Sequence, residues 1–199
     1  MSKGVTRRGF GFVAGAVVFG TVNGRMFAQD DPPVPKIGPV EAPFERDYSA
    51  PSFKPSWKKQ QINRELVQDF VIYAHSDLEM VKKLLEREPS LLNGAVDWGG
   101  GDWETALGGA SHMGRKDIVE HLLSRGARID LFCATMMGLL DVVKSFLTLQ
   151  PALIEARGPH GFSLHFHAQV GGESAIATLN YLQSVKQIEL KQVPFLNKK

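Results

Sequence analysis

Apolar and polar positions follow one pattern in three segments of the chain, residues 76–85, 114–123 and 138–147. In each segment a small residue is followed three places on by an acid, five places on by valine, and eight and nine places on by a bulky apolar pair. Positions three and four apart share one face of an α-helix, and an acid in the first turn favours the positive end of the helix dipole. The pattern therefore predicts three amphipathic helices. We expect their buried faces to consist of Val81, Leu84, Leu85, Val119, Leu122, Leu123, Val143, Phe146 and Leu147.

The residues around these helices predict a second, shorter helix in each unit. Residues 104–114 can form a short helix that Thr105 caps and Gly114 ends, directly before the middle amphipathic helix. Proline or glycine follows each amphipathic helix and returns the chain. A looser fourth copy of the unit begins at Gly161. The chain is thus expected to repeat one short helix, a turn and one amphipathic helix.

The second unit resembles the ankyrin repeat. Residues at matching positions are Thr105, Leu107, Ala110, Gly114, Val119, Leu122, Leu123, Gly126 and Ala127. The resemblance implies an all-α fold, an ankyrin-repeat helical solenoid of about four helix-turn-helix units, over residues 63–185. It also implies a protein–protein interaction module.

The second unit departs from the ankyrin pattern at two residues. Ala106 replaces the usual proline and Gly108 the usual histidine, so the threonine-to-histidine hydrogen bond of that family cannot form. The spacing is irregular too, because the valines of the first and second helices are 38 residues apart and those of the second and third are 24 apart. The standard unit has about 33 residues. The longer interval predicts an enlarged hairpin over residues 96–103.

This hairpin carries two tryptophans around three glycines and predicts the surface that binds a partner. Such a glycine stretch contributes little to a core, and aromatic side chains dominate the energy of many interfaces. In the alternative, both indole rings fold back over the edge of the first and second units. We expect a partner protein to contact the hairpin and the adjoining helix through Asp97, Trp98, Asp102, Trp103, His112 and Met113.

Residues 1–28 have the order of a signal peptide, with a basic opening, an apolar stretch over residues 10–22 and a polar exit that ends at Ala28. As a helix, the apolar stretch would be about 20 Å long, which is too short for the hydrocarbon core of a bilayer. We therefore expect cleavage near Gln29, a periplasmic or extracellular location, and no stable membrane span after the signal is removed.

The opening also resembles the twin-arginine export signal, in which Ser or Thr, two arginines and any residue precede phenylalanine. Arg7, Arg8 and Phe10 fit this pattern. Gly11 and Met26 depart from it, because a bulky apolar residue and a small residue are usual at these places. The twin-arginine route implies a chain that folds before export.

Two segments flank the predicted repeat domain. Residues 29–62 contain seven prolines and no sustained apolar period, which is typical of a semi-extended linker. Recognition of this proline-rich segment by a partner is the alternative. Residues 186–199 form the C-terminal tail.

Composition and charge exclude several function classes. The 199 residues carry a formal net charge of +2, and removal of residues 1–28, with four basic residues and no acid, leaves −2. A slightly acidic chain without a basic stripe lacks the surface that binds a phosphate backbone, so we expect no nucleic-acid partner. The single cysteine, Cys133, excludes an intrachain disulfide and a cysteine-cluster zinc site.

Motifs of catalysis are missing from the sequence. It contains no Gly-x-Ser-x-Gly elbow, no phosphate loop and no His-Glu-x-x-His helix. Cys133 has apolar neighbours, which indicates a buried and inert thiol. We therefore expect a non-enzymatic protein without a cofactor that binds another protein. An immunity-like partner of an enzyme encoded beside it is a further possibility.

Three histidines within eight residues, His160, His165 and His167, offer an alternative function. Imidazoles in such a group can bind zinc, copper or nickel. On a strand His165 and His167 would face one ion, whereas on the helix that the repeat pattern predicts they point about 200° apart. Metal binding by this histidine cluster stays the alternative to protein binding.

Overall fold

The computed structural model describes residues 41–193, 195 and 196. Predictions for residues 1–40 lie outside this part of the chain, and they include the cleavage site and the export-signal residues Arg7, Arg8 and Phe10. Among the described residues no helix combines the length and the apolar character that crossing a bilayer requires.

The described chain is mostly helical, in agreement with the predicted all-α class. Its α-helices form consecutive pairs, each joined by a short turn: α1 (Arg64–Tyr73) with α2 (Leu78–Arg87), α3 (Ala106–His112) with α4 (Lys116–Ser124), α5 (Leu131–Met136) with α6 (Leu140–Leu149), and α7 (Leu164–Gly171) with α8 (Ile176–Val185). A hairpin of β1 (Ala95–Asp97) and β2 (Trp103–Thr105) stands between the first two pairs. Short 3-10 helices are η1 (Pro89–Asn93), η2 (Pro151–Glu155), η3 (Pro159–Gly161) and η4 (Gly172–Ala175).

Local sequence signals fix where several helices begin and end. Asp77, Thr105 and Asp130 each accept a hydrogen bond from the backbone N–H three residues on, at 2.9, 3.0 and 2.7 Å, and so cap α2, α3 and α5. The cap at Thr105 confirms the prediction from the sequence. Gly138, between α5 and α6, has a φ of 74°, and a Cβ there would collide with the backbone of Ser174. That turn therefore requires glycine.

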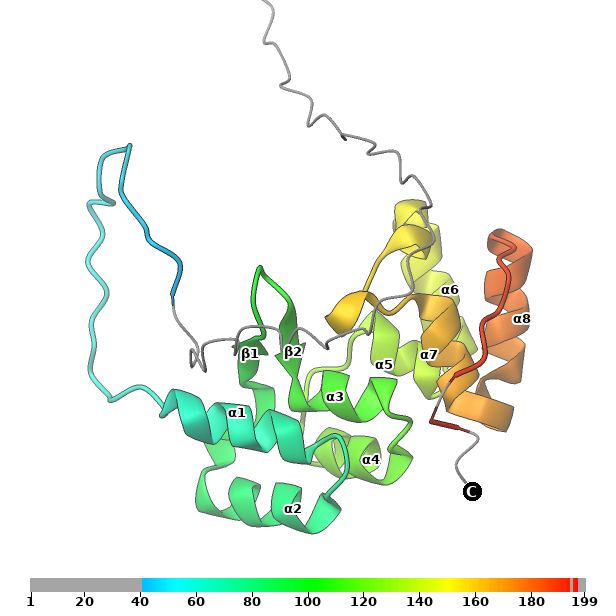
Figure 1. Ribbon diagram of the computed structural model, residues 1–199, viewed down its shortest axis with the longest axis horizontal. Coiled ribbons are helices and arrows are strands. Elements are labelled where there is room, and N and C mark those ends of the chain that lie inside the picture. The colour runs from blue at the N-terminus through cyan, green and yellow to red at the C-terminus, as the bar shows by residue number, and fades with distance from the viewer. Residues whose placement is uncertain (1–40, 194, 197–199) are drawn as a thin grey trace, which may run out of the picture. The chain divides into compact units, whose positions relative to one another are not determined.

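The first helices of the pairs pack in chain order, with α3 between α1 and α5 and α5 between α3 and α7 (Figure 1). Among the second helices, α2 contacts α4 and α6 contacts α8. Their apolar faces form two clusters, one mainly among α1 to α4 and one among α5 to α8. Of the core positions predicted from periodicity, Leu123 and Phe146 are half-buried and all the others are buried. The predicted buried faces are thus largely confirmed.

The enlarged hairpin expected from the sequence is also confirmed. Its strands pair antiparallel with Val96 opposite Glu104. Its loop is an ordered turn, because an Asp97 Oδ1 oxygen accepts hydrogen bonds from the backbone N–H groups of Gly99 and Gly101 at 2.9 and 3.1 Å. All three glycines of the loop have positive φ, a conformation that L side chains rarely adopt.

The described part of the predicted C-terminal tail packs against the helices. Val193 is buried in the first apolar cluster, and the Gln169 side chain of α7 donates a hydrogen bond to the Lys191 carbonyl oxygen at 3.0 Å. The segment after α8 therefore covers part of the core.

Candidate functional site

Both tryptophans of the hairpin are exposed to solvent, to different degrees. Trp103 is 63% exposed and Trp98 is 36% exposed. The Trp98 indole N–H donates a hydrogen bond to Glu104 Oε2 at 2.7 Å, which fixes its ring against the base of the hairpin. The exposed arrangement expected from the sequence therefore applies to both rings, although Trp98 is held by Glu104 and is the less exposed of the two.

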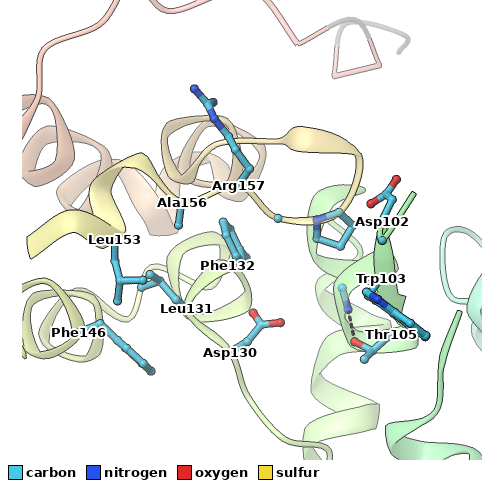
Figure 2. Close-up of a pocket in the computed structure, with 14 residues that line it drawn as sticks. Asp102, Trp103, Thr105, Asp130, Leu131, Phe132, Phe146, Leu153, Ala156 and Arg157 are labelled. Carbon is cyan, nitrogen blue, oxygen red and sulfur yellow. Dashed lines mark hydrogen bonds between the residues drawn. The ribbon is translucent and has the colours of Figure 1, made fainter. Parts of the chain in front are cut away.

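A groove of about 410 Å³ lies beside Trp103 (Figure 2). Asp102 and Trp103 of the hairpin form one of its sides, and the start of α5 and the segment before η3 form others. Its apolar lining comprises Trp103, Leu131, Phe132, Phe146, Leu153, Ala156 and Pro159, and its charged lining comprises Asp102, Asp130 and Arg157. The groove combines an apolar surface with charges of both signs.

His112 and Met113, which the sequence assigned to the partner surface, lie deeper than expected. His112 is 3% exposed and Met113 is half-buried. Because α3 is buried over its whole length, His112 cannot reach a partner, and the prediction is corrected for this residue. Its ring faces the interior of the hairpin base.

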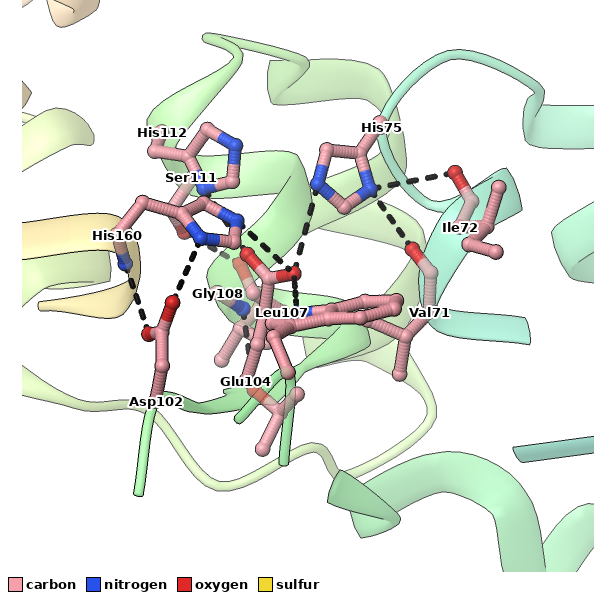
Figure 3. A network of polar contacts seen from close by, with 12 residues as sticks. Val71, Ile72, His75, Asp102, Glu104, Leu107, Gly108, Ser111, His112 and His160 are labelled. Carbon is pink, nitrogen blue, oxygen red and sulfur yellow. Dashed lines mark hydrogen bonds and ion pairs between the residues drawn. The ribbon is translucent and has the colours of Figure 1, made fainter. Parts of the chain in front are cut away.

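Glu104 lies at the centre of a polar cluster at the base of the hairpin (Figure 3). Side chains alternate along a strand, so β2 turns Trp103 outward and Glu104 inward, where the carboxylate is fully buried. His112 Nδ1 lies 3.1 Å from Glu104 Oε1, and the Nε2 atoms of His75 and His160 lie 3.5 and 3.6 Å from Glu104 Oε2. One ligand atom from each of these four residues lies within 4.8 Å of the others. We call His75, Glu104, His112 and His160 the hairpin-base cluster.

His75 follows α1, and backbone carbonyls fix its protonated nitrogen. Its Nδ1 lies 2.9 Å from the Val71 carbonyl oxygen and 3.2 Å from that of Ile72. Carbonyl oxygens only accept hydrogen bonds, so Nδ1 carries a proton. In the neutral ring the lone pair is then on Nε2, which faces Glu104.

His160 has the same arrangement, held by a carboxylate. It lies in η3 with a φ of 57°, and among the described residues other than glycine it alone has a positive φ. Its backbone N–H and its Nδ1–H donate to the two oxygens of Asp102, both at 2.9 Å. The hydrogen bond from the His160 backbone is the main reason that the pKa of Asp102 lies below its usual value. An ionised Asp102 therefore keeps the proton on Nδ1 and turns Nε2 toward Glu104.

The charge on Glu104 is buried among these rings. Burial raises the pKa of its carboxyl, but the imidazole of His112, the Trp98 N–H and the nearby His75 lower it by more, so the net pKa lies below its usual value. Glu104 Oε1 and His112 Nδ1 are buried 3.1 Å apart, and neither has a hydrogen bond to any other group of the described residues. An ionised carboxylate beside unpaired polar atoms is costly in a protein interior.

The other two histidines of the predicted metal cluster bind the backbone instead. His165 Nε2 lies 2.9 Å from the Lys186 carbonyl oxygen, and His167 Nδ1 lies 2.8 Å from that of Ser163. Both rings are buried, and burial lowers the pKa of both, that of His167 to about 4. Neither belongs to the group of ligand atoms around Glu104, so His160 is not assembled with them.

The sequence reasoning missed His75 and Glu104 because it searched for ligands close together in the chain. Glu104 carried a usable signal: directly before the helix cap Thr105, it alternates with the outward Trp103 and is therefore an acid at an inward strand position. The sequence around His75 contains no such signal, because His75 comes close to Glu104 only through the packing of α1 against α3.

The single thiol takes no part in this site. Cys133 is buried in α5, and burial raises the pKa of its thiol to about 11. A thiol with this pKa is protonated at neutral pH, and the burial of Cys133 expected from the sequence is confirmed.

Comparison of the chain with models of known protein families found no match, and comparison with curated proteins found none either. Proposals about function therefore rest on the geometry of the hairpin, the groove and the hairpin-base cluster.

Proposed function

We propose that this chain is a non-enzymatic protein-binding module, exported to the periplasm or cell surface, in which about four ankyrin-type helix pairs form a solenoid. Three features support it: the helices are paired, their first members pack in chain order, and a hairpin projects between the first two pairs. In such repeat proteins each unit contacts its neighbours and leaves an extended surface for a partner. The sequence of residues 1–28 supports export.

The observation that carries the proposal is the exposure of Trp103 beside the groove. A tryptophan that a partner covers contributes a large contact area, and tryptophan is among the residues that dominate binding energies. Strand pairing and the inward Glu104 on β2 hold the Trp103 backbone in place, so little order has to be gained on binding. Leu131 and Phe132 in the groove offer apolar contacts to a side chain of the partner.

The test is capture of a partner from envelope extract by the wild-type chain and by Trp103→Ala. Trp57→Ala is the matched control, because Trp57 is 72% exposed and lies before α1 in neither a helix nor a strand. We expect Trp103→Ala to lose the captured protein and Trp57→Ala to keep it. Both variants should melt at the wild-type temperature, because neither side chain is in the core.

Two outcomes contradict the proposal. Capture by Trp103→Ala at the wild-type level would remove the hairpin from the binding surface. Equal loss of the captured protein in both variants would show that it adheres to exposed indole rings in general and does not bind a specific surface at the hairpin.

A further inference from the structure

We propose that the hairpin-base cluster binds one zinc ion, with His75 Nε2, a Glu104 carboxylate oxygen, His112 Nδ1 and His160 Nε2 as its ligands. Three imidazoles and one carboxylate are donors that zinc accepts, and four protein ligands are typical of a structural zinc site. This site is independent of the protein-binding proposal, because its ligand atoms point into the hairpin base and Trp103 points out of it.

The separations between the ligand atoms fit tetrahedral coordination. Bonds from zinc to imidazole nitrogen or carboxylate oxygen measure about 2.0–2.1 Å, so neighbouring ligands in a tetrahedron lie about 3.3 Å apart. His112 Nδ1 lies 3.1 Å from Glu104 Oε1, whereas the Nε2 atoms of His75 and His160 lie 3.5 and 3.6 Å from the other oxygen, Oε2. One ligand atom from each of the four residues lies within 4.8 Å of the others. An octahedral site with similar bonds brings neighbouring ligands to about 2.9 Å. The two separations to Oε2 are closer to the tetrahedral value, and the separation to Oε1 lies between the two geometries.

The directions of the lone pairs call for a cation between these atoms. His75 and His160 donate their Nδ1 protons to the Val71 carbonyl and to Asp102. In the neutral rings the Nε2 lone pairs then face the lone pairs of an ionised Glu104, which is repulsive without a positive charge between them. A zinc ion between these atoms accepts the lone pairs of the imidazoles and one lone pair of the Glu104 carboxylate. It also gives a partner to His112 Nδ1 and, where Oε1 is the ligand oxygen, to Glu104 Oε1, two buried atoms that otherwise have only each other within reach.

The groups behind the ligands are those that orient metal ligands in proteins. Histidine ligands usually donate their second N–H to a backbone carbonyl or a carboxylate, and ligating carboxylates are themselves hydrogen-bonded. Here a backbone carbonyl holds His75, Asp102 holds His160, and the Trp98 N–H holds Glu104. The left-handed backbone of His160, fixed by the same Asp102, is strain of the kind found at functional sites.

A metal-free network is the competing account of the cluster. In it, protons on Nε2 of His75 and His160 make both rings cationic beside Glu104. That arrangement satisfies the carboxylate without an ion and predicts no stoichiometric zinc binding. The side chains of His75 and His160 are 24% and 34% exposed, so zinc added in solution can reach the cluster.

The first measurement is zinc binding by the full chain, purified without a histidine tag and stripped with a chelator. We expect one zinc per chain by elemental analysis after dialysis, with submicromolar affinity by competition with a chelating dye. Cobalt in the same site should give the intense visible absorption of four-coordinate cobalt. The weak band of six-coordinate cobalt would contradict the tetrahedral assignment.

Variants then assign the ligands. Glu104→Gln keeps the shape of the side chain and should weaken zinc binding by roughly 100-fold or more, because it removes the negative ligand. His160→Ala should do the same, and its partly exposed position makes misfolding a small concern. His121→Ala is the matched control, because it removes a histidine of α4 outside the cluster, and it should bind zinc like the wild type.

Asp102→Asn separates the role of a positioning residue from that of a ligand. It leaves the four ligands in place and should weaken zinc binding by about 10- to 100-fold, the range for groups that orient ligands, while one zinc still binds at saturation. Zinc should also raise the melting temperature of the wild type and of His121→Ala, but not that of Glu104→Gln.

The proposal is overturned if the wild type binds less than one zinc per chain at tens of micromolar free zinc. It is equally overturned if folded Glu104→Gln and His160→Ala bind zinc with the affinity of His121→Ala, because the bound ion would then lie elsewhere.

Discussion

Trp103 and Glu104 are neighbours in β2 with opposite environments. The Trp103 ring is exposed beside the groove, whereas the Glu104 carboxylate is fully buried among three imidazoles. Strand alternation separates them, since successive side chains point to opposite faces. One short strand can therefore carry two separate roles, and a substitution at one residue should leave the role of the other intact.

His167 should make the stability of the fold sensitive to mild acid. Burial lowers its pKa to about 4 in the folded chain, against an ordinary value of 6.5. Between these two pKa values the unfolded chain binds a proton at this histidine and the folded chain does not. The contribution of neutral His167 to the free energy of unfolding is therefore complete above pH 6.5 and is lost as the pH falls toward 4. From the shift, we expect the free energy of unfolding to drop by about 3 kcal/mol across this range.

The measurement is denaturant unfolding of the wild type and of His167→Asn at pH 7, 5.5 and 4. Asparagine can donate to the Ser163 carbonyl in place of Nδ1 and does not titrate. The variant should be less stable than the wild type at pH 7, because it fills less space, and should lose less stability toward pH 4. Parallel curves for the two proteins would show that folding does not lower the pKa of His167.

At the scale of the elements, the helices depend on the apolar faces that periodicity identified. Leu122 of α4 is fully buried, so Leu122→Ala should lower the free energy of unfolding by roughly 2–5 kcal/mol through lost contacts and a cavity. Leu149 at the end of α6 is 85% exposed and provides the control: Leu149→Ala should change the free energy of unfolding by less than about 0.5 kcal/mol. Equal effects in denaturant unfolding would mean that the assigned face of α4 is wrong.

The helices and the hairpin could be predicted from the sequence because their signals are local. The valine and the apolar pair of each amphipathic helix, the cap at Thr105 and the glycine run of the hairpin all act within a few residues. The burial of helix α3, by contrast, could not be predicted from local signals. Its short length and small residues allow neighbouring helices to enclose it, so His112 is buried, although its position suggested an exposed face.

The hairpin-base cluster could not be predicted, because its members come from four separate elements. His75 follows α1, Glu104 is in β2, His112 ends α3 and His160 is in η3. The sequence groups His160 with His165 because the two are close along the chain. The left-handed backbone of His160 turns it toward Asp102 and away from the helix that contains His165. Only the packing of α1, α3, the hairpin and η3 brings the four side chains together.

At the scale of the described domain, the two proposals meet in the hairpin. A zinc ion in the hairpin-base cluster would connect the hairpin to the segments before α2 and α7 and to α3 between them. That link would hold Trp103 and the groove in a fixed relation, which reduces the cost of ordering when a partner binds. Protein binding remains testable without zinc, because Trp103 contributes no ligand.

Site-specific photo-cross-linking in the living cell is the measurement that tests the protein-binding account most directly. A photoreactive benzoylphenylalanine is placed at Trp103 in one variant and at Trp57 in another, both aromatic and exposed. The account predicts a discrete adduct with one other envelope protein from position 103 and none from position 57. A chain that reaches the envelope and gives no adduct from position 103, or the same adducts from both positions, would contradict it.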